Sequence, residues 1–156
     1  MSHLSTIFQL DKETLAALRE LTRVLHDSQS ALTDAAAKVQ CPETARLFYD
    51  LATRRAQLGH ELRQYIQLNA QEPPSTGTLK GEAQKLWMEL RSSVSGGKAE
   101  LILADVERLE DYLVVEYKKL IPKTAGSPLS AVFHEQFIAV KQGREQVDEL
   151  RRKKRQ

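Results

Sequence analysis

The chain has 156 residues, of which 41% are hydrophobic and 28% charged, with only seven glycines and five prolines. This length fits one domain with its own core, and the composition is that of an ordinary globular protein. The net charge of +2 and the isoelectric point near 8.7 exclude a strongly basic or strongly acidic chain. No segment approaches the roughly 20 apolar residues of a membrane-spanning helix.

Cys41 is the only cysteine, so no internal disulfide can form. It stands at a predicted helix start, where a thiolate can be stabilised, but no base neighbours it and we interpret it as a bystander. The first residues, MSHLSTIFQL, lack the features of a signal peptide, so we expect a cytoplasmic protein. RRKKRQ, residues 151–156, is interpreted as a solvated helix end. Nucleic-acid binding through this tail is less favoured, because no aromatic or basic stripe accompanies it.

Apolar residues recur at steps of three and four from residue 11 to about residue 39, which predicts an amphipathic helix of about seven turns. Its apolar positions are Leu15, Leu18, Leu21, Leu25, Leu32, Ala35 and Val39. Pro42 suits the first position of a second helix, which ends near residue 68 before the segment QEPPSTGT. Its apolar positions are Leu47, Phe48, Leu51, Leu58, Leu62, Tyr65, Ile66 and Leu68. The short break between the two helices predicts that they are antiparallel neighbours.

Three further helices are predicted by the same spacing. A short one covers residues 79–93, and a long one covers residues 98–121. Pro122 predicts a loop, after which Ser127 caps a last helix that begins at Pro128 and runs to about residue 150. The apolar positions are Leu86, Trp87 and Leu90, then Leu103, Val106, Leu109, Leu113, Tyr117 and Leu120, then Leu129, Phe133, Phe137, Val140, Val147 and Leu150.

Two helical hairpins are thus separated by a segment with a short helix of its own. A helix of about 25 residues is about 38 Å long, and a segment of this size can cross the full length of such a bundle. We therefore predict an all-α, ferritin-like four-helix bundle, in which two antiparallel hairpins are joined by a long crossover containing a short fifth helix. The domain covers residues 11–150, between an N-terminal extension, residues 1–10, and the basic C-terminal tail, residues 151–156.

Several segments resemble a known family. Trp87-Met88-Glu89-Leu90, Gly96-Gly97 and ILADVERLED at residues 102–111 are similar to a bacterial family of ferritin-like four-helix bundles, a domain of unknown function. PETARLFYDLATRRAQLGHEL, residues 42–62, resembles the second helix of that family, and Asp27 with Ala35-Ala36 fits its first. The resemblance covers about residues 15–150. It implies the fold and supplies no established activity.

A ferritin-like di-iron centre needs a carboxylate from each of two helices and a Glu-x-x-His pair from each of the other two. The first helix has no acid on its apolar side. The second has Gln57-x-x-His60, whose amide brings no charge to a metal ion. The fourth has Glu107-x-x-Glu110, and the last has Arg144 where the family often carries histidine. We expect no bound cofactor; the alternative is iron or another divalent metal held by Glu107, Glu110, His60 and Gln57.

Arg55, Glu110 and Arg144 lie near the middle of their helices, each four residues after one apolar position and three before the next. This spacing places them on or beside the buried sides of the helices. Because an isolated buried charge is very costly, buried charges are paired. The sequence therefore predicts a buried ion-pair cluster in which Glu110 accepts from Arg55, Arg144 or both, at the place where a di-iron relative keeps its metals.

These interpretations leave two functions open. The first is a non-catalytic binding or assembly protein, with a degenerate metal site, that works as a homodimer or with a protein partner. The second is a metal-binding redox or storage bundle that uses Glu107 and Glu110. No nucleophile–base pair, zinc-protease helix or phosphate-binding loop occurs in the sequence, so an enzyme is the less favoured interpretation.

Overall fold

The structure is a computed structural model that describes residues 6–74, 82–96 and 98–155, of which residues 82, 83 and 95 are described by their backbone alone. Five helices make up this part of the chain: α1 (Lys12–Lys38), α2 (Pro42–Leu68), α3 (Glu82–Gly96), α4 (Ala99–Lys123) and α5 (Ser130–Arg155). No strand occurs among these residues, so the prediction of an all-α fold is confirmed. Within the same residues, no helix is both long and apolar enough to cross a membrane.

The bounds of α1 and α2 follow from local chemistry and agree with the prediction. Asp11 caps α1, where its Oδ1 accepts a hydrogen bond of 2.7 Å from the Thr14 N–H. Pro42 begins α2, where the missing N–H of proline is not needed. The predicted start of α3 at Leu79 lies outside the described residues, and α3 ends at Gly96, slightly later than predicted.

The connection between α4 and α5 differs from its prediction. α4 continues through Pro122, since a proline this close to a helix end removes few hydrogen bonds. Thr124 closes the last turn, because its N–H and hydroxyl donate to the Leu120 carbonyl over 3.1 and 2.9 Å. α5 begins at Ser130, later than predicted, and continues to Arg155. Residues 151–155 of the basic tail therefore belong to α5, as a helix end requires, and residue 156 lies outside the described residues.

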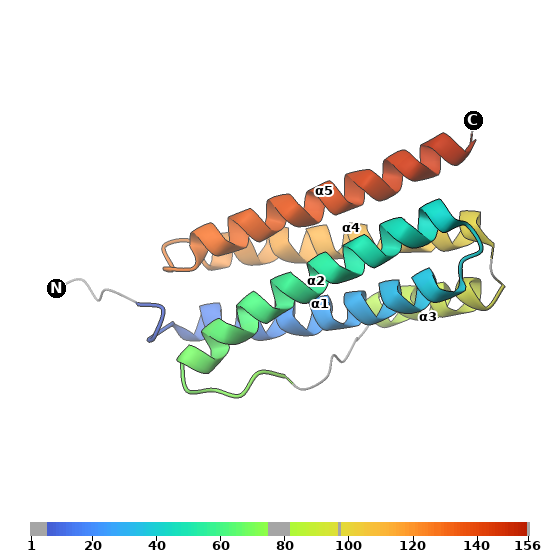
Figure 1. Ribbon diagram of the computed structural model, residues 1–156. Helices are drawn as coiled ribbons and strands as arrows, with labels where there is room; N and C mark the ends of the chain where they lie inside the picture. The colour runs from blue at the N-terminus through green and yellow to red at the C-terminus, as the bar shows by residue number, and fades with distance from the viewer. Residues whose placement is uncertain (1–5, 75–81, 97, 156) are drawn as a thin grey trace.

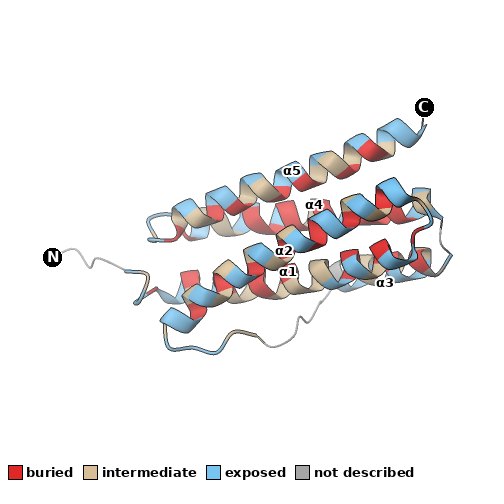
Figure 2. Cartoon of the chain, in the orientation of Figure 1, coloured by how far each residue is buried: buried red, intermediate tan, exposed pale blue. Residues whose placement is uncertain are grey.

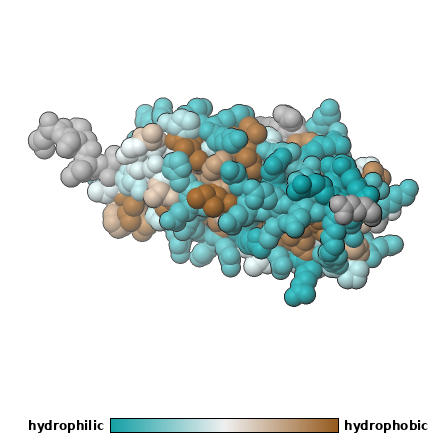
Figure 3. All heavy atoms as spheres, turned by 90° about the horizontal axis from the view of Figure 1, so that it is seen from above, coloured by the Kyte–Doolittle hydropathy of each residue, from teal (hydrophilic) through white to brown (hydrophobic). Residues whose placement is uncertain are grey.

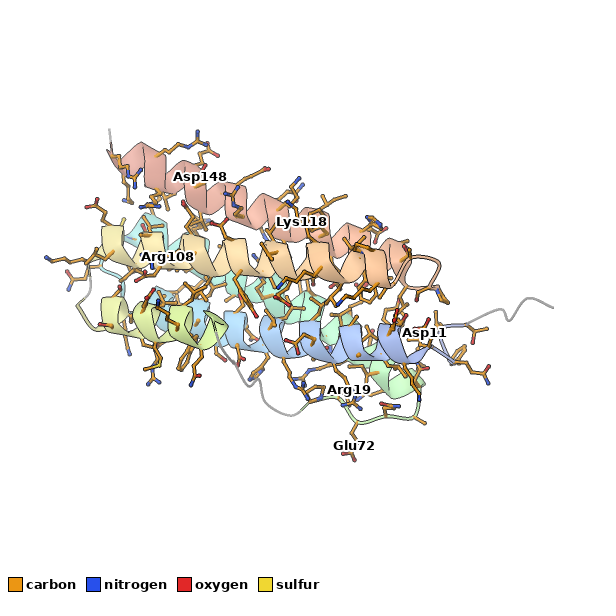
Figure 4. All side chains as sticks on the ribbon, turned by 180° about the vertical axis from the view of Figure 1, so that it is seen from behind. Asp11, Arg19, Glu72, Arg108, Lys118 and Asp148 are labelled. Carbon is orange, nitrogen blue, oxygen red and sulfur yellow. The ribbon has the colours of Figure 1, made fainter. Side chains whose placement is uncertain are left out.

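α1 and α2 form one hairpin and α4 and α5 a second, and the hairpins pack through α1 against α4 and α2 against α5 (Figure 1). The end of α2 lies beside the start of α1, where the Leu10 N–H donates to Asn69 Oδ1 over 2.9 Å. Nearby, Arg19 Nη2 donates to Gln71 Oε1 over 2.8 Å, and Figure 4 labels this arginine. These contacts make the first two helices antiparallel.

α3 packs against α1 and α4, which leaves α2 and α5 to form the opposite side of the bundle (Figure 1). Trp87 is partly buried against the core. Arg108 of α4, labelled in Figure 4, donates to Glu89 of α3 over 2.7 Å. The Ser93 hydroxyl donates to Asp105 of α4. α3 is thus attached by Trp87, by two polar contacts and by the buried side chains of Leu90 and Val94.

The buried side chains form two apolar clusters, one in each half of the bundle. Figure 2 shows that buried positions alternate with exposed ones along the helices. The first joins the end of α1, the start of α2, α3, the start of α4 and the end of α5. The second joins the start of α1, the end of α2, the end of α4 and the start of α5. The middle of the bundle, between the two clusters, holds the buried charged residues described below.

Candidate functional site

Arg55 of α2 and Glu110 of α4 form an ion pair in the centre of the bundle, where Arg55 Nη2 donates to Glu110 Oε2. Their residues are only 1% and 2% exposed. On α2, Arg55 lies between Leu51 of the first apolar cluster and Leu62 of the second. On α4, Glu110 lies between Val106 of the first apolar cluster and Leu113 of the second. The pair therefore forms a charged level between two apolar cores.

Arg144 does not join this pair, which corrects the three-residue cluster predicted from the sequence. It donates to Asp111 instead, and the two side chains are 44% and 47% exposed. The buried side of α5 runs through Val140, Gly143 and Val147, so Gly143 has the inward position. The buried positions of α5 are thus residues 140, 143 and 147, whereas the sequence analysis predicted residues 140, 144 and 147.

Gly143 makes room for Arg55. A Cβ at Gly143 would lie 2.8 Å from Arg55 Nη2 and 3.0 Å from Leu51 Cδ2, closer than packed carbon atoms normally come. The absence of a side chain at this position therefore lets the guanidinium lie between α2 and α5. Because glycine carries no apolar group, the periodicity of the sequence gave no sign of its role.

A second polar level lies about two helical turns from the ion pair. The Tyr117 hydroxyl donates to Gln136 Oε1 over 2.7 Å, and Gln136 Nε2 donates to Glu61 Oε1 over 2.7 Å. Tyr117 is seven residues after Glu110 on α4, and Gln136 is seven residues before Gly143 on α5. The apolar spacing of the sequence predicts Tyr117 as a core position and gives no sign of Gln136, although the two-turn spacing from Glu110 and Gly143 is a signal that could have found the pair.

Burial dominates the electrostatics of both levels. It raises the pKa of the Glu110 carboxyl, and the Arg55 guanidinium opposes the rise. Burial also raises the pKa of the Tyr117 hydroxyl. Among the described residues, Glu110 Oε1 and two nitrogens of Arg55, Nε and Nη1, have no hydrogen-bond partner. A buried pair with unsatisfied atoms sets the register of helices more than it stabilises them.

The residues of the alternative metal site do not come together. Glu107 accepts a hydrogen bond of 3.0 Å from Arg151 Nη1, and Glu110 is paired with Arg55. Gln57 and His60 are exposed on α2. No group of three or more His, Cys, Asp or Glu side chains with the geometry to hold a metal ion occurs in the described parts of the chain.

Cys41 has a partner that the sequence did not indicate. Lys154, near the end of α5, donates to Cys41 Sγ over 3.0 Å. Contacts with Thr44 and, second, with Lys154 lower the pKa of the Cys41 thiol to about 7. Next to it, Lys153 Nζ lies 3.0 Å from Glu43 Oε1. The end of α5 is thus attached to the first turn of α2.

Comparison with known proteins places the chain in a family. Residues 13–123, from α1 to the end of α4, match the family described as a domain of unknown function, DUF2383. The chain belongs to this family. No curated protein and no solved structure matches it. Arg55 and Glu110 lie inside the segment that defines the DUF2383 domain, whereas Gly143 lies outside it.

In this DUF2383 domain, Glu110→Ala should lower the free energy of unfolding by about 3–5 kcal/mol, because it leaves the buried Arg55 without its counter-charge. Asp111→Ala is the matched control, since it removes an exposed pair of the same type and should cost about 0–1 kcal/mol. Urea unfolding measures both values. Equal losses in the two variants would contradict a special role for the buried pair.

Gly143→Ala should lower the free energy of unfolding by about 1–3 kcal/mol, because the added methyl group overpacks the space beside Arg55. Gly59→Ala is the control. A Cβ at that buried glycine would make an ordinary contact of 3.8 Å with Leu25, so alanine should stabilise the helix by up to about 1 kcal/mol. Thermal unfolding compares the variants, and stabilisation by both would rule out the close approach of α5 to Arg55.

Alkylation of Cys41 by iodoacetamide should accelerate with pH around a midpoint of about 7, because the thiolate is the reactive form. Lys154→Met should raise this midpoint, since the ammonium group that favours the thiolate is removed. Lys153→Met, at the adjacent position, removes a contact with Glu43 and should change the midpoint less. If Lys154→Met leaves the pH dependence unchanged, the contact does not control the thiol.

Proposed function

We propose that the five helices have ferritin-like connectivity, with one long crossover between the two hairpins. The end of α2 lies beside the start of α1, whereas α3 packs with the second half of α1 and the first half of α4. α2 and α4 point in the same direction, since their first halves share one apolar cluster and their second halves share the other. This common direction supports a crossover rather than a simple up-and-down bundle.

We infer that the protein is a non-catalytic binding or assembly protein with a degenerate metal site. The observation that supports this is the pairing of each acid in Glu107-x-x-Glu110 with an arginine, Arg151 and Arg55 respectively. In a di-iron bundle, inward carboxylates of this kind hold cations. A guanidinium supplies the positive charge that a carboxylate needs in an apolar interior, so these acids are neutralised without a metal ion.

The outer surface supports a role in binding. Met88 of α3, Leu101 of α4 and Ile138 of α5 are 61%, 53% and 56% exposed. Seen from above, the molecule is mostly hydrophilic, with apolar side chains gathered in separate patches (Figure 3). In the proposed assembly role, a second copy of the chain or another protein would cover apolar groups of this kind.

Metal analysis tests the proposal. Protein purified from cells grown in iron-rich medium should contain iron far below a stoichiometric amount, because Arg55 and Arg151 occupy the carboxylates. Added Fe²⁺ or Mn²⁺ should leave the thermal unfolding midpoint unchanged, since a ligand raises that midpoint only by binding the folded state. Both measurements use the full chain.

Iron bound in a stoichiometric amount would overturn this proposal if Glu110→Gln and Glu107→Gln each remove the iron. Asp111→Asn is the matched control, since it changes an acid next to Glu110 that faces the surface. Iron lost in both glutamate variants and kept in the control would identify a metal-binding redox or storage bundle. The DUF2383 chain would then use the acids of α4 as ligands after displacing their arginines.

A further inference from the structure

A polar groove runs along the flank of the α1–α2 hairpin and has a volume of about 350 Å³. α1 contributes Thr22, His26 and Gln29. His26 and Gln29 follow Thr22 by four and seven residues, so the three side chains share one side of the helix. α2 contributes Ala56, Gly59, His60 and Arg63, again along one side. The groove is thus built by two rows of side chains that face each other across a helix pair.

Small residues of α2 form part of this groove. Gly59 is buried, and a Cβ there would lie 3.8 Å from Leu25 Cβ, so the two helices are close at this point. Ala56 lies one turn earlier on the same side. The larger polar side chains of α2, His60 and Arg63, follow these small residues along the helix. Space is therefore available beside the polar groups of His26, His60 and Arg63.

The groove is lined by groups that can donate hydrogen bonds, and no carboxylate lines it. Two of these groups already have contacts: the Thr22 hydroxyl donates to the Leu18 carbonyl over 2.6 Å, and His60 Nε2 lies 3.4 Å from Gln64 Nε2. His26 and His60 supply imidazole groups, Gln29 an amide and Arg63 a guanidinium. No acid pairs with Arg63 among the described residues. A guanidinium without an acid partner among these residues carries a positive charge that attracts an anion and repels a cation.

Other grooves of the bundle differ in this respect. The cavity between α1 and α3 contains Asp34, and the one beside α3 and α4 contains Asp111. Asp27, which follows His26 in the sequence, lines a separate cavity with Trp87. On α1, Glu20 lies 3.9 Å from Arg23 and is exposed. None of these acids lines the groove.

We propose that this groove binds a small molecule through an oxyanion, a phosphate or a carboxylate group. Arg63 supplies the charge and a two-pronged donor that matches the oxygens of either group, and His26 and His60 add donors from both helices. The volume lies at the lower end of the range for small-ligand sites, about 300–1,000 Å³. The site lies apart from Arg55 and Glu110 and does not depend on the absence of metal there.

NMR titration of the isotope-labelled full chain tests the proposal, with inorganic phosphate and citrate as separate probes and chloride at matched ionic strength as the blank. Signals of His26 and His60 should shift saturably with at least one probe, and the probe that binds more tightly identifies phosphate or carboxylate as the favoured group. Arg63→Gln should weaken that binding about tenfold or more, because it removes a charge-assisted hydrogen-bond donor.

Arg46→Gln is the matched control. It removes the same charge from an exposed position of α2. Arg46 lies about 25 Å from Arg63 toward the start of the helix, at 1.5 Å per residue, so its replacement should leave the affinity unchanged. Linear shifts without saturation, or equal weakening by both arginine variants, would overturn the proposal by indicating general screening. Zn²⁺ binding that His26→Ala abolishes, with no phosphate or citrate binding, would overturn it in favour of a metal site.

Failure of this proposal is separable from failure of the proposed function. Binding at the groove depends on Arg63 and is insensitive to Glu110→Gln, whereas a metal in the bundle centre has the opposite dependence. Circular dichroism of the Arg63→Gln variant establishes that the helices are intact. If the wild-type chain shows no saturable shift at His26 or His60 with either probe, the groove is not an oxyanion site.

Discussion

The buried ion pair between Arg55 and Glu110 is the constraint around which the bundle is organised. A guanidinium and a carboxylate in an apolar interior are costly unless they meet, so α2 and α4 must pack in the register that brings them together. Gly143 extends this requirement to α5, because only a residue without a side chain leaves space for the guanidinium. One charged level thus fixes how three helices slide past one another, while apolar packing fills the halves on either side.

The same charged level connects the fold to the proposed functions. Arg55 and Arg151 pair with Glu110 and Glu107 of α4, and on this basis we propose that the interior of this DUF2383 domain serves as a scaffold. The features available to a ligand or partner then lie on the outside: exposed apolar side chains, and the polar groove that contains Arg63. Both proposals therefore assign binding to surfaces, and both treat the centre of the bundle as a support that holds those surfaces in place.

Much of this arrangement could be predicted from the sequence, because it depends on spacing along a single helix. Steps of three and four identified the long helices and placed Arg55 and Glu110 on buried sides. The same spacing gave the wrong result at Arg144. Between Val140 and Val147, either residue 143 or residue 144 can lie on the buried side of the helix. Because glycine has no side chain, its residue type did not indicate that residue 143 is the buried one. Contacts such as Lys154 with Cys41 were not predictable, because they depend on how α5 lies across α2.

The way in which α5 meets the charged level has a consequence for the substitutions that this chain can accept. At this level α5 presents bare backbone, so it needs no chemical group that matches the guanidinium. Residues 13–123 carry both charges, and the covering helix lies beyond that segment. In this chain α5 therefore constrains the charged centre by size alone: any side chain at residue 143 would meet the guanidinium, whatever its chemical character.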